Sequence, residues 1–382
     1  MKKIFALILA GLLAVSMVSC GNNEEDKNKN NETVAGAQNY IEEEKNHGRF
    51  EYRRNDEGDF EIVKYESYSV TPASITLPSK VNDVEIVGIA ADAFKADNSI
   101  KEVTIPSTYA YIGDYAFYDC DSLTKISLSK NLETIGVGTF ENCNALADIT
   151  IPSLVTVIPE FAFKDCTAIT TLDLSNITII NKGAFQKCTN LETLKIEKIQ
   201  YATKEAFYGC DKLKYNKEEN GNLLYLGNDT NPTLLLVSAD SLTIDECVIS
   251  ATTTVVADKA FNNCTYLVKV TLSDSIKVLP GTAFENCTAI TYTLSENGLY
   301  LGSATNPTMA LVGIDLTSKE DFKLNKDVKI LCDTAFSTYH ALKDISYEGT
   351  KAEWDSIIKV EDWNGSITVN VTCSDNTFTV LG

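Results

Sequence analysis

Apolar side chains recur along most of this chain at a fixed period. A phenylalanine, usually preceded by alanine and followed three residues later by cysteine, returns every 22 or 23 residues over the first six copies. A period in the twenties is typical of a solenoid, in which each coil buries its apolar side chains against the next coil. The nine repeat phenylalanines are Phe94, Phe117, Phe140, Phe163, Phe185, Phe207, Phe261, Phe284 and Phe336.

Each coil combines two short stretches with different hydrophobic spacing. Ile126 and Leu128 flank a polar residue, which is the alternation of a β-strand. Residues 116–120 carry apolar side chains at i and i+3, which suits one helical or 3₁₀ turn. We therefore predict an α/β solenoid of short parallel strands, corners and helical or 3₁₀ turns. Its stacked strands should form one parallel sheet, with about 4.8 Å between neighbours.

Two intervals between repeat phenylalanines are longer, and both contain the same inserted motif. Leu224–Val237 and Leu299–Val312 each place two apolar runs on either side of a Gly/Asn/Pro segment. This pattern predicts a β-hairpin. The two copies are offset by 75 residues, so a longer unit was duplicated. We expect the hairpin inserts near residues 216–254 and 294–328.

The repeated residues resemble the BspA-type leucine-rich repeats of bacterial surface proteins. The resemblance extends from about Phe50 to the end of the chain, and its motif is specific because it recurs nine times. It implies a leucine-rich repeat solenoid, a location outside the cytoplasm and a role in adhesion. It does not imply one particular ligand.

Both ends of the repeat region require a cap, because an end coil would otherwise expose its core and a strand edge. Residues 49–87 contain alternating runs around Asn55–Gly58, so we expect an N-terminal β cap with a hairpin. The leucine-rich repeat solenoid should then occupy residues 88–347. Residues 348–382 contain both tryptophans and are expected to form a C-terminal cap.

The first 48 residues differ in composition from the repeats. Residues 1–20 have a basic start and an apolar segment too short for a good membrane span, and they end in Met17–Cys20, which resembles a bacterial lipobox. We expect a lipoprotein signal peptide with Cys20 as the lipidated residue. The alternative is an ordinary secretory signal with a chance cysteine. Residues 21–48 are acidic and Asn-rich with few large apolar side chains, which predicts a disordered tether.

Eleven cysteines in an exported chain would normally suggest disulfides, but their positions argue otherwise. Neighbours in a stacked column would lie about 4.8 Å apart, whereas bonded Cβ atoms lie nearer 3.8 Å. We predict free thiols that pack as small core residues. A bond among Cys247, Cys332 and Cys373, which lie off the column, stays open. The column contains Cys120, Cys143, Cys166, Cys188, Cys210, Cys264 and Cys287.

The net charge and the lack of catalytic motifs in the sequence exclude several classes of function. The balance of 33 basic against 53 acidic residues gives a net charge of −20, which would repel nucleic acid and anionic lipid surfaces. It favours either solubility or a cationic or metal-bridged partner. The two histidines, His47 and His340, accompany no catalytic, metal or phosphate-binding motif. We therefore expect no enzymatic activity, no cofactor and no resident metal.

Two sets of residues are candidates for binding. Outward positions between the buried strand residues form a flat polar face, which is either a contact surface or merely a soluble sheet surface. Aromatic residues of the hairpins and of the C-terminal cap are the alternative, with capping of the last coil as the simpler role of the tryptophans. The candidate binding face contains Thr104, Ser127, Thr150, Asp173, Lys195 and Thr271. The alternative set is Tyr225, Tyr300, Trp354 and Trp363.

Together these features predict an exported adhesion or interaction protein, lipid-anchored at the bacterial cell surface, in the outer membrane. Its expected partners are host or bacterial surface proteins. A glycan-binding surface lipoprotein that uses the aromatic set is the alternative, and an enzyme is the least favoured hypothesis.

Overall fold

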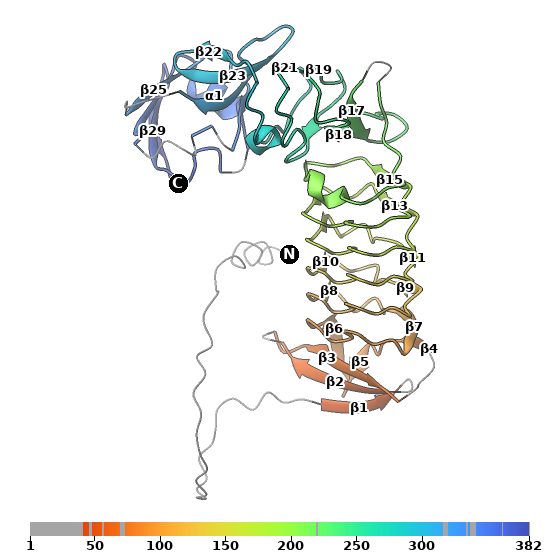
Figure 1. The fold of residues 1–382 in the computed structure, drawn as a ribbon. Helices are drawn as coiled ribbons and strands as arrows, with labels where there is room; N and C mark the ends of the chain where they lie inside the picture. Colours follow the sequence, from red (N-terminus) through yellow and green to blue (C-terminus); the bar gives the residue numbers. More distant parts are fainter. Residues whose placement is uncertain are drawn as a thin grey trace, which may run out of the picture. The chain divides into compact units, whose positions relative to one another are not determined.

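The computed structural model describes residues 41–45, 48–55, 57–68, 73–218, 221–315, 320–333, 335–336, 341–360 and 362–381. These residues form a β-solenoid of about 13 turns with almost no helix (Figure 1). The expected signal peptide, Cys20 and most of the expected tether lie outside the described residues, as do His47 and His340.

The N-terminal end of the solenoid is an antiparallel sheet. It is built from β1 (Ile41–Lys45), β2 (Gly48–Arg54) and β3 (Phe60–Ser67). The expectation of a disordered tether through residue 48 is wrong at its end, because residues 41–45 pair with β2. Few apolar side chains are needed there, since backbone hydrogen bonds and the Tyr52 hydroxyl, which donates to Glu43 at 3.0 Å, hold this edge strand.

Each coil carries two short strands, not the one strand that the pattern predicted, so the strands stack into two parallel ladders. The first ladder contains β4 (Ala73–Thr76), β7 (Ile100–Thr104), β9 (Lys125–Ser127) and β11 (Asp148–Ile149), followed by β13 (Thr171–Leu174) and β15 (Thr193–Ile196). The second contains β6 (Val84–Ile89), β8 (Tyr111–Ile112) and β10 (Thr134–Ile135), followed by β12 (Val157–Ile158), β14 (Ile179–Ile180) and β16 (Tyr201–Ala202). The short β5 (Lys80–Val81) pairs with β6.

The arc around each repeat phenylalanine is mostly not helical, which corrects the α/β prediction. In the second coil the N–H groups of Tyr115, Phe117 and Asp119 donate to carbonyls of the next coil at 2.8–3.0 Å. Tyr115 and Asp119 have φ values of 53° and 57°, a left-handed conformation that a helix does not contain. A helix would need these N–H groups for its own bonds, so stacking excludes it.

Both inserts contain the expected antiparallel hairpins. They are β17 (Leu223–Leu226) with β18 (Leu235–Ala239) and β23 (Gly298–Ser303) with β24 (Ala310–Ile314). The second strand of each hairpin continues the parallel stack, onto β20 (Val255–Val256) and β26 (Ile330–Leu331) respectively. The helical turns of the repeat region lie before the inserts, as the 3₁₀ turns η2 (Lys204–Phe207) and η3 (Gly281–Phe284).

The C-terminal part of the chain completes the stack. Its remaining solenoid strands are β19 (Glu246–Val248), β21 (Lys269–Leu272), β22 (Thr293–Ser295), β25 (Asp321–Leu324) and β27 (Asp344–Tyr347). The last elements are α1 (Lys351–Ser356), β28 (Ile358–Lys359), β29 (Val369–Thr372) and β30 (Thr377–Val380). Thr350 and Glu353 form a reciprocal capping box that begins α1.

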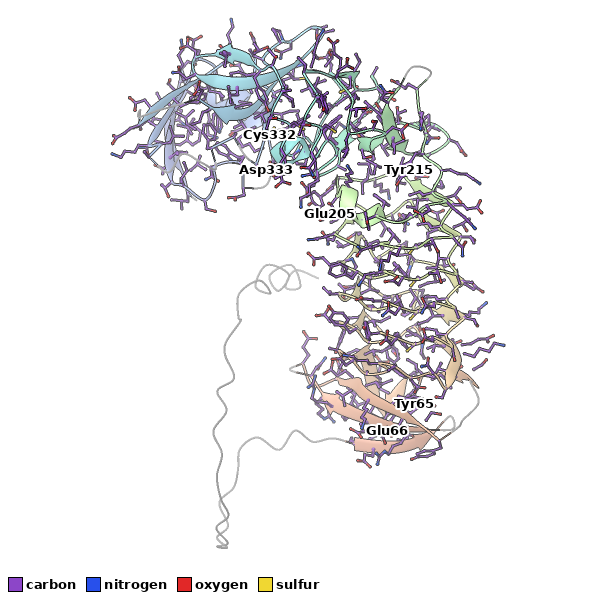
Figure 2. All side chains as sticks on the ribbon, in the orientation of Figure 1. Tyr65, Glu66, Glu205, Tyr215, Cys332 and Asp333 are labelled. Atoms are coloured by element: carbon purple, nitrogen blue, oxygen red, sulfur yellow. The ribbon has the colours of Figure 1, made fainter. Side chains whose placement is uncertain are left out.

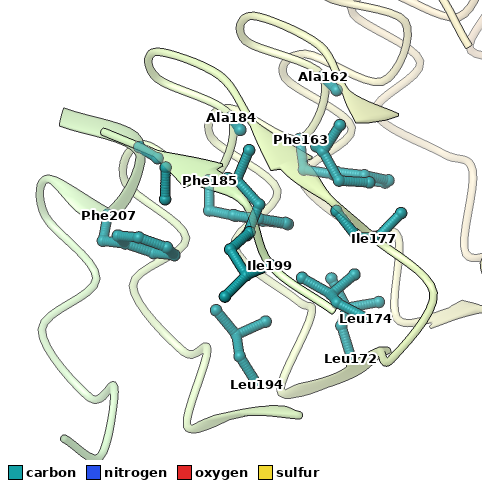
Figure 3. Packing of buried hydrophobic residues seen from close by; sticks show 14 of the residues in the cluster. Ala162, Phe163, Leu172, Leu174, Ile177, Ala184, Phe185, Leu194, Ile199 and Phe207 are labelled. Carbon is teal, nitrogen blue, oxygen red and sulfur yellow. The ribbon is translucent and has the colours of Figure 1, made fainter. Parts of the chain in front are cut away.

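The interior is one apolar column followed by a second cluster. Neighbouring repeat phenylalanines from Phe94 to Phe207, and Phe261 with Phe284, stack with ring centroids 4.8–6.2 Å apart, and Figure 3 shows Phe163, Phe185 and Phe207 in this arrangement. Burying one such ring stabilises the fold by roughly 1.5–3 kcal/mol. The second cluster begins at Tyr300 and includes Phe336 and both tryptophans. The core therefore changes composition where the second hairpin enters the stack.

The column cysteines are free, buried thiols, as predicted. The thiols of Cys143, Cys166 and Cys188 each donate to the carbonyl of the repeat phenylalanine one coil earlier, at 2.9–3.0 Å. Cys247, Cys332 and Cys373 are also free, which answers the question that the sequence left open.

Candidate functional site

Five of the six candidate face residues lie on the first ladder. Thr104 on β7 pairs with Ser127 on β9, and Asp173 on β13 pairs with Lys195 on β15. Thr150 follows β11 directly. Thr104, Thr150, Asp173 and Lys195 are exposed and Ser127 is half-buried. We call Thr104, Ser127, Thr150, Asp173 and Lys195 the strand face.

Thr271 does not belong to this surface. It lies on β21 and pairs with Val248 of β19 and Gly302 of β23, in a different sheet from the other five residues. The first hairpin separates the two sheets along the chain. The insert could be seen in the sequence, but the interruption of the outward row that it causes could not.

Charges on and beside the strand face are largely compensated. Lys125 lies 2.6 Å from Asp148, and Lys195 lies 3.0 Å from Glu197 and 3.8 Å from Asp173. Ser175 donates its hydroxyl and backbone N–H to Asp173, and these bonds hold the pKa of the carboxyl below its usual value. The surface is therefore polar without a strong charge of either sign, which suits a broad contact surface better than acid–base catalysis.

The aromatic residues proposed for glycan binding are buried, so that expectation is wrong. Tyr225 and Tyr300 are 0% exposed, and their hydroxyls accept hydrogen bonds from the backbone N–H groups of Ser250 and Asn325 at 3.2 Å. Trp354 and Trp363 are 2% and 8% exposed, with ring centroids 5.7 Å apart. A ring packed on both faces offers no surface on which a sugar can stack.

Neither a cluster of metal-ligating side chains nor a membrane-spanning helix is found among the described residues. No group of three or more His, Cys, Asp or Glu side chains comes together among them. Within the same part of the chain, no helix is both long and apolar enough to cross a membrane.

Burial raises the pKa of the Cys210 thiol to about 12, so this thiol stays protonated at neutral pH.

A groove of about 800 Å³ that borders the second ladder at β14 and β16 was not expected from the sequence. We call it the inner groove. Its apolar lining includes Ile179, Tyr201, Val278, Ile358 and Val360, which come from four separate parts of the chain. Its charged lining includes Asp258, Lys259, Lys277, Glu285, Asp333, Lys359 and Asp362. Figure 2 labels Asp333 among these side chains. No local pattern marks a groove whose walls are contributed by coils more than a hundred residues apart.

The family of the chain follows from its repeats. A family model described as the BspA type leucine rich repeat region matches residues 87–214 and 239–308 in six copies. The chain therefore belongs to the BspA-type leucine-rich repeat family, as the sequence resemblance implied.

The chain is similar to several solved leucine-rich repeat structures. A leucine-rich repeat protein from Bacteroides ovatus is 18% identical, covering 89% of this chain and 100% of its own, with a TM-score of 0.41. One from T. pallidum is 21% identical, covering 63% of this chain and 88% of its own, with a TM-score of 0.39. A leucine rich cell surface protein from Faecalibacterium prausnitzii is 20% identical, covering 84% of this chain and 98% of its own, with a TM-score of 0.31. A search of curated proteins found no match.

Proposed function

We propose that this chain is a non-catalytic interaction module of the bacterial cell surface that binds protein partners through the strand face. One observation carries the proposal: small or charged polar side chains occupy the same outward position on consecutive coils of one ladder. Buried apolar residues between them hold the backbone, so the face is presented as a rigid area. Its partners would be host or bacterial surface proteins.

The proposal includes export and a lipid anchor. The apolar leader and the lipobox-like Met17–Cys20 support attachment at the outer membrane through Cys20. A lipid-anchored domain on a tether could engage partners by repeated weak contacts, since anchoring raises its effective concentration. Mass spectrometry of the protein isolated from cell membranes should find acyl chains on Cys20. An unmodified Cys20 would remove the anchor from the proposal.

Binding to a panel of purified host-matrix proteins, compared with a glycan array, tests the strand face. The double variant T104R/T150R places two large side chains on this face and should weaken binding to any matrix protein that the wild type binds. Asp173 is left intact because it accepts hydrogen bonds from Ser175. Each exposed substitution should change stability by less than about 0.5 kcal/mol.

The matched control is T134R/T156R, which alters two exposed threonines, one on β10 and one directly before β12 of the second ladder. It should bind like the wild type. Equal binding by T104R/T150R and wild type would exclude the strand face, and binding to glycans alone would exclude a protein partner.

A further inference from the structure

The two ladders differ in the outward positions of the same coils. On the first ladder these positions hold Thr150, Asp173 and Lys195, all exposed and polar. On the second ladder the corresponding positions of β12, β14 and β16 hold Val157, Ile179 and Tyr201, which are half-buried. A sheet face that meets only water is normally polar. The apolar row on the second ladder therefore requires its own explanation.

This row leads into the inner groove. Ile179 and Tyr201 line it from one side, and Val278, Ile358 and Val360 line it from later coils. The last three side chains pack on the core and remain half-buried. A second hollow of about 640 Å³ shares Lys277 and Ile358 with the groove, so the concave surface extends along the chain. A concave lining that combines apolar and charged side chains is typical of binding sites.

The types of side chain that line the inner groove favour a polypeptide ligand over a sugar. Tyr201 is the one aromatic ring in the lining that the structure describes, and the other apolar contacts are aliphatic. The aliphatic side chains of Ile179, Val278 and Ile358 come from separate coils, and each can contact one of the alternating side chains of an extended peptide.

The charges of the groove are not balanced. Four carboxylates line it, against three lysines. The ammonium group of Lys259 donates to Glu205, outside the lining, at 3.2 Å. That of Lys359 donates to the carbonyls of Trp354 and Ile357 at 2.7 and 2.9 Å. Three of the carboxylates also accept hydrogen bonds, Glu285 from Asn262, Asp333 from Gly281 and Asp362 from Ser366. The lining therefore carries one more negative than positive charge toward a ligand.

Asp258 adds a specific acceptor to this excess. Its Oδ1 atom is buried without a hydrogen-bond partner among the described residues. A buried acceptor without a partner costs free energy that a donor from a ligand would recover. A lysine or arginine side chain supplies such a donor together with a positive charge.

We infer that the inner groove binds an extended, aliphatic segment of a partner polypeptide that carries a lysine or arginine. This inference rests on the proposed function, because it gives the protein partner a second contact besides the strand face. The segment places aliphatic side chains on Ile179, Val278 and Ile358, and its cation faces the carboxylates of Asp258 and Asp362.

Selection from a library of random twelve-residue peptides displayed on phage, with the full chain as target, tests this inference. Selected peptides should alternate Val, Ile or Leu with other residues and contain Lys or Arg. The enriched peptides are then synthesised with a fluorescent label, and their affinity is measured by anisotropy. Selection of acidic peptides, or of none, would overturn the inference. Tighter binding of linear oligosaccharides than of any selected peptide would also overturn it.

Variants locate the contact. I179R/I358R, which removes two aliphatic contacts and adds like charge, should bind the basic peptide at least about tenfold more weakly. D258N, which preserves size, should weaken the basic peptide while leaving a peptide with Gln in place of Lys unaffected. T134R, which lies on the same ladder outside the groove, should bind normally.

The strand-face variant separates this inference from the proposed function. T104R/T150R should bind the selected peptides like the wild type even if it loses matrix proteins. If I179R/I358R and D258N bind the basic peptide as the wild type does, the groove is not its site. The proposal that the strand face binds protein partners would still be tested separately, by the binding of T104R/T150R to matrix proteins.

Discussion

At the scale of the residue, the column cysteines show why this position holds sulfur. A thiol is small enough for the interior of a narrow coil and can still donate a hydrogen bond. Cys166 donates to Phe140 and Cys210 donates to Phe185, each at 3.0 Å. Alanine would fill less volume and donate nothing, whereas valine would add a methyl group without a donor. The cysteine therefore connects neighbouring coils as well as filling space.

The buried thiols should make the protein less stable in alkali. Burial raises the pKa of Cys210 to about 12 and that of Cys287 to about 11, from the usual 9.0. The folded state keeps protons that the unfolded chain loses. This contribution to stability is complete below pH 9 and disappears as the pH rises toward 12. We expect a lower free energy of unfolding at pH 10.5 than at pH 8, by up to about 1.4 kcal/mol per pH unit for each such thiol.

Urea unfolding followed by circular dichroism at the two pH values measures this loss. Burial also raises the pKa of Tyr225 and Tyr300 to about 12, with the same sign, so a matched variant is needed. The variant C210A should lose less stability between pH 8 and pH 10.5 than the wild type does. An equal loss in both proteins would show that Cys210 does not contribute.

At the scale of the element, hydrogen bonds between coils decide where helical turns form. In most coils alternate N–H groups of the arc, such as that of Phe117, donate to the next coil, and those between them, such as that of Tyr118, donate to carbonyls three residues back. At η2 and η3 the bonds three residues back are kept, but among the described residues the N–H groups of Phe207 and Phe284 have no bond to a following coil. Both turns precede a hairpin insert. An arc folds as a 3₁₀ turn where these bonds to the following coil are missing, because the bonds three residues back then set its geometry.

The hairpin tyrosines should stabilise the inserts without taking part in binding. The Tyr225 hydroxyl accepts a hydrogen bond from the buried N–H of Ser250. The variant Y225F leaves this donor without a partner and should lower the free energy of unfolding by about 1–3 kcal/mol. Y300F should cost less, because the Asn325 N–H is only partly buried.

Chemical unfolding of the single variants measures these costs. Y208F is the matched control, because Tyr208 is 67% exposed, and it should leave stability unchanged. If Y225F is as stable as Y208F, the hydroxyl does not hold the hairpin.

At the scale of the whole molecule, the presence of two apolar clusters predicts that a core substitution destabilises mainly the coils around it. Each coil contacts mainly its neighbours, so stability is a sum of local and nearest-neighbour contributions. Phe163 lies in the first cluster and is 0% exposed, between Phe140 and Phe185. F163A should cost about 3–5 kcal/mol.

Hydrogen–deuterium exchange of F163A should show where that cost appears. Exchange should rise in residues 135–190, around the cavity, much more than in residues 363–380, which include Trp363, Val369 and Val371 of the second cluster. A uniform increase along the chain would mean that the two clusters unfold as one unit, contrary to this expectation.

Much of the architecture is visible in the sequence because burial leaves a periodic trace. The recurrence of Phe117, Phe140 and Phe163 predicts coils of 22 or 23 residues, and the shared position of Cys143 and Cys166 predicts a column of free thiols. The two hairpins follow from apolar runs on either side of a turn segment. In each case the side chain is buried by the coil itself or by an identical neighbour, so local sequence is enough.

Tertiary structure alone decided the features that depend on which residues, distant in the sequence, lie beside a residue in space. The spacing of Ala116 and Cys120 suits a helical turn, but the next coil accepts the N–H groups of Tyr115, Phe117 and Asp119, and the arc forms turns with positive φ values in place of a helix. The sequence suggests that Tyr225 is an exposed anchor, yet its side chain is buried and its hydroxyl accepts a hydrogen bond from the backbone of Ser250. The inner groove combines Ile179 with Ile358, and a pattern with a period near 23 carries no information on contacts across that distance. The sequence by itself thus determined which side chains are inside, while the packed coils determined which backbone groups pair and which surfaces remain open.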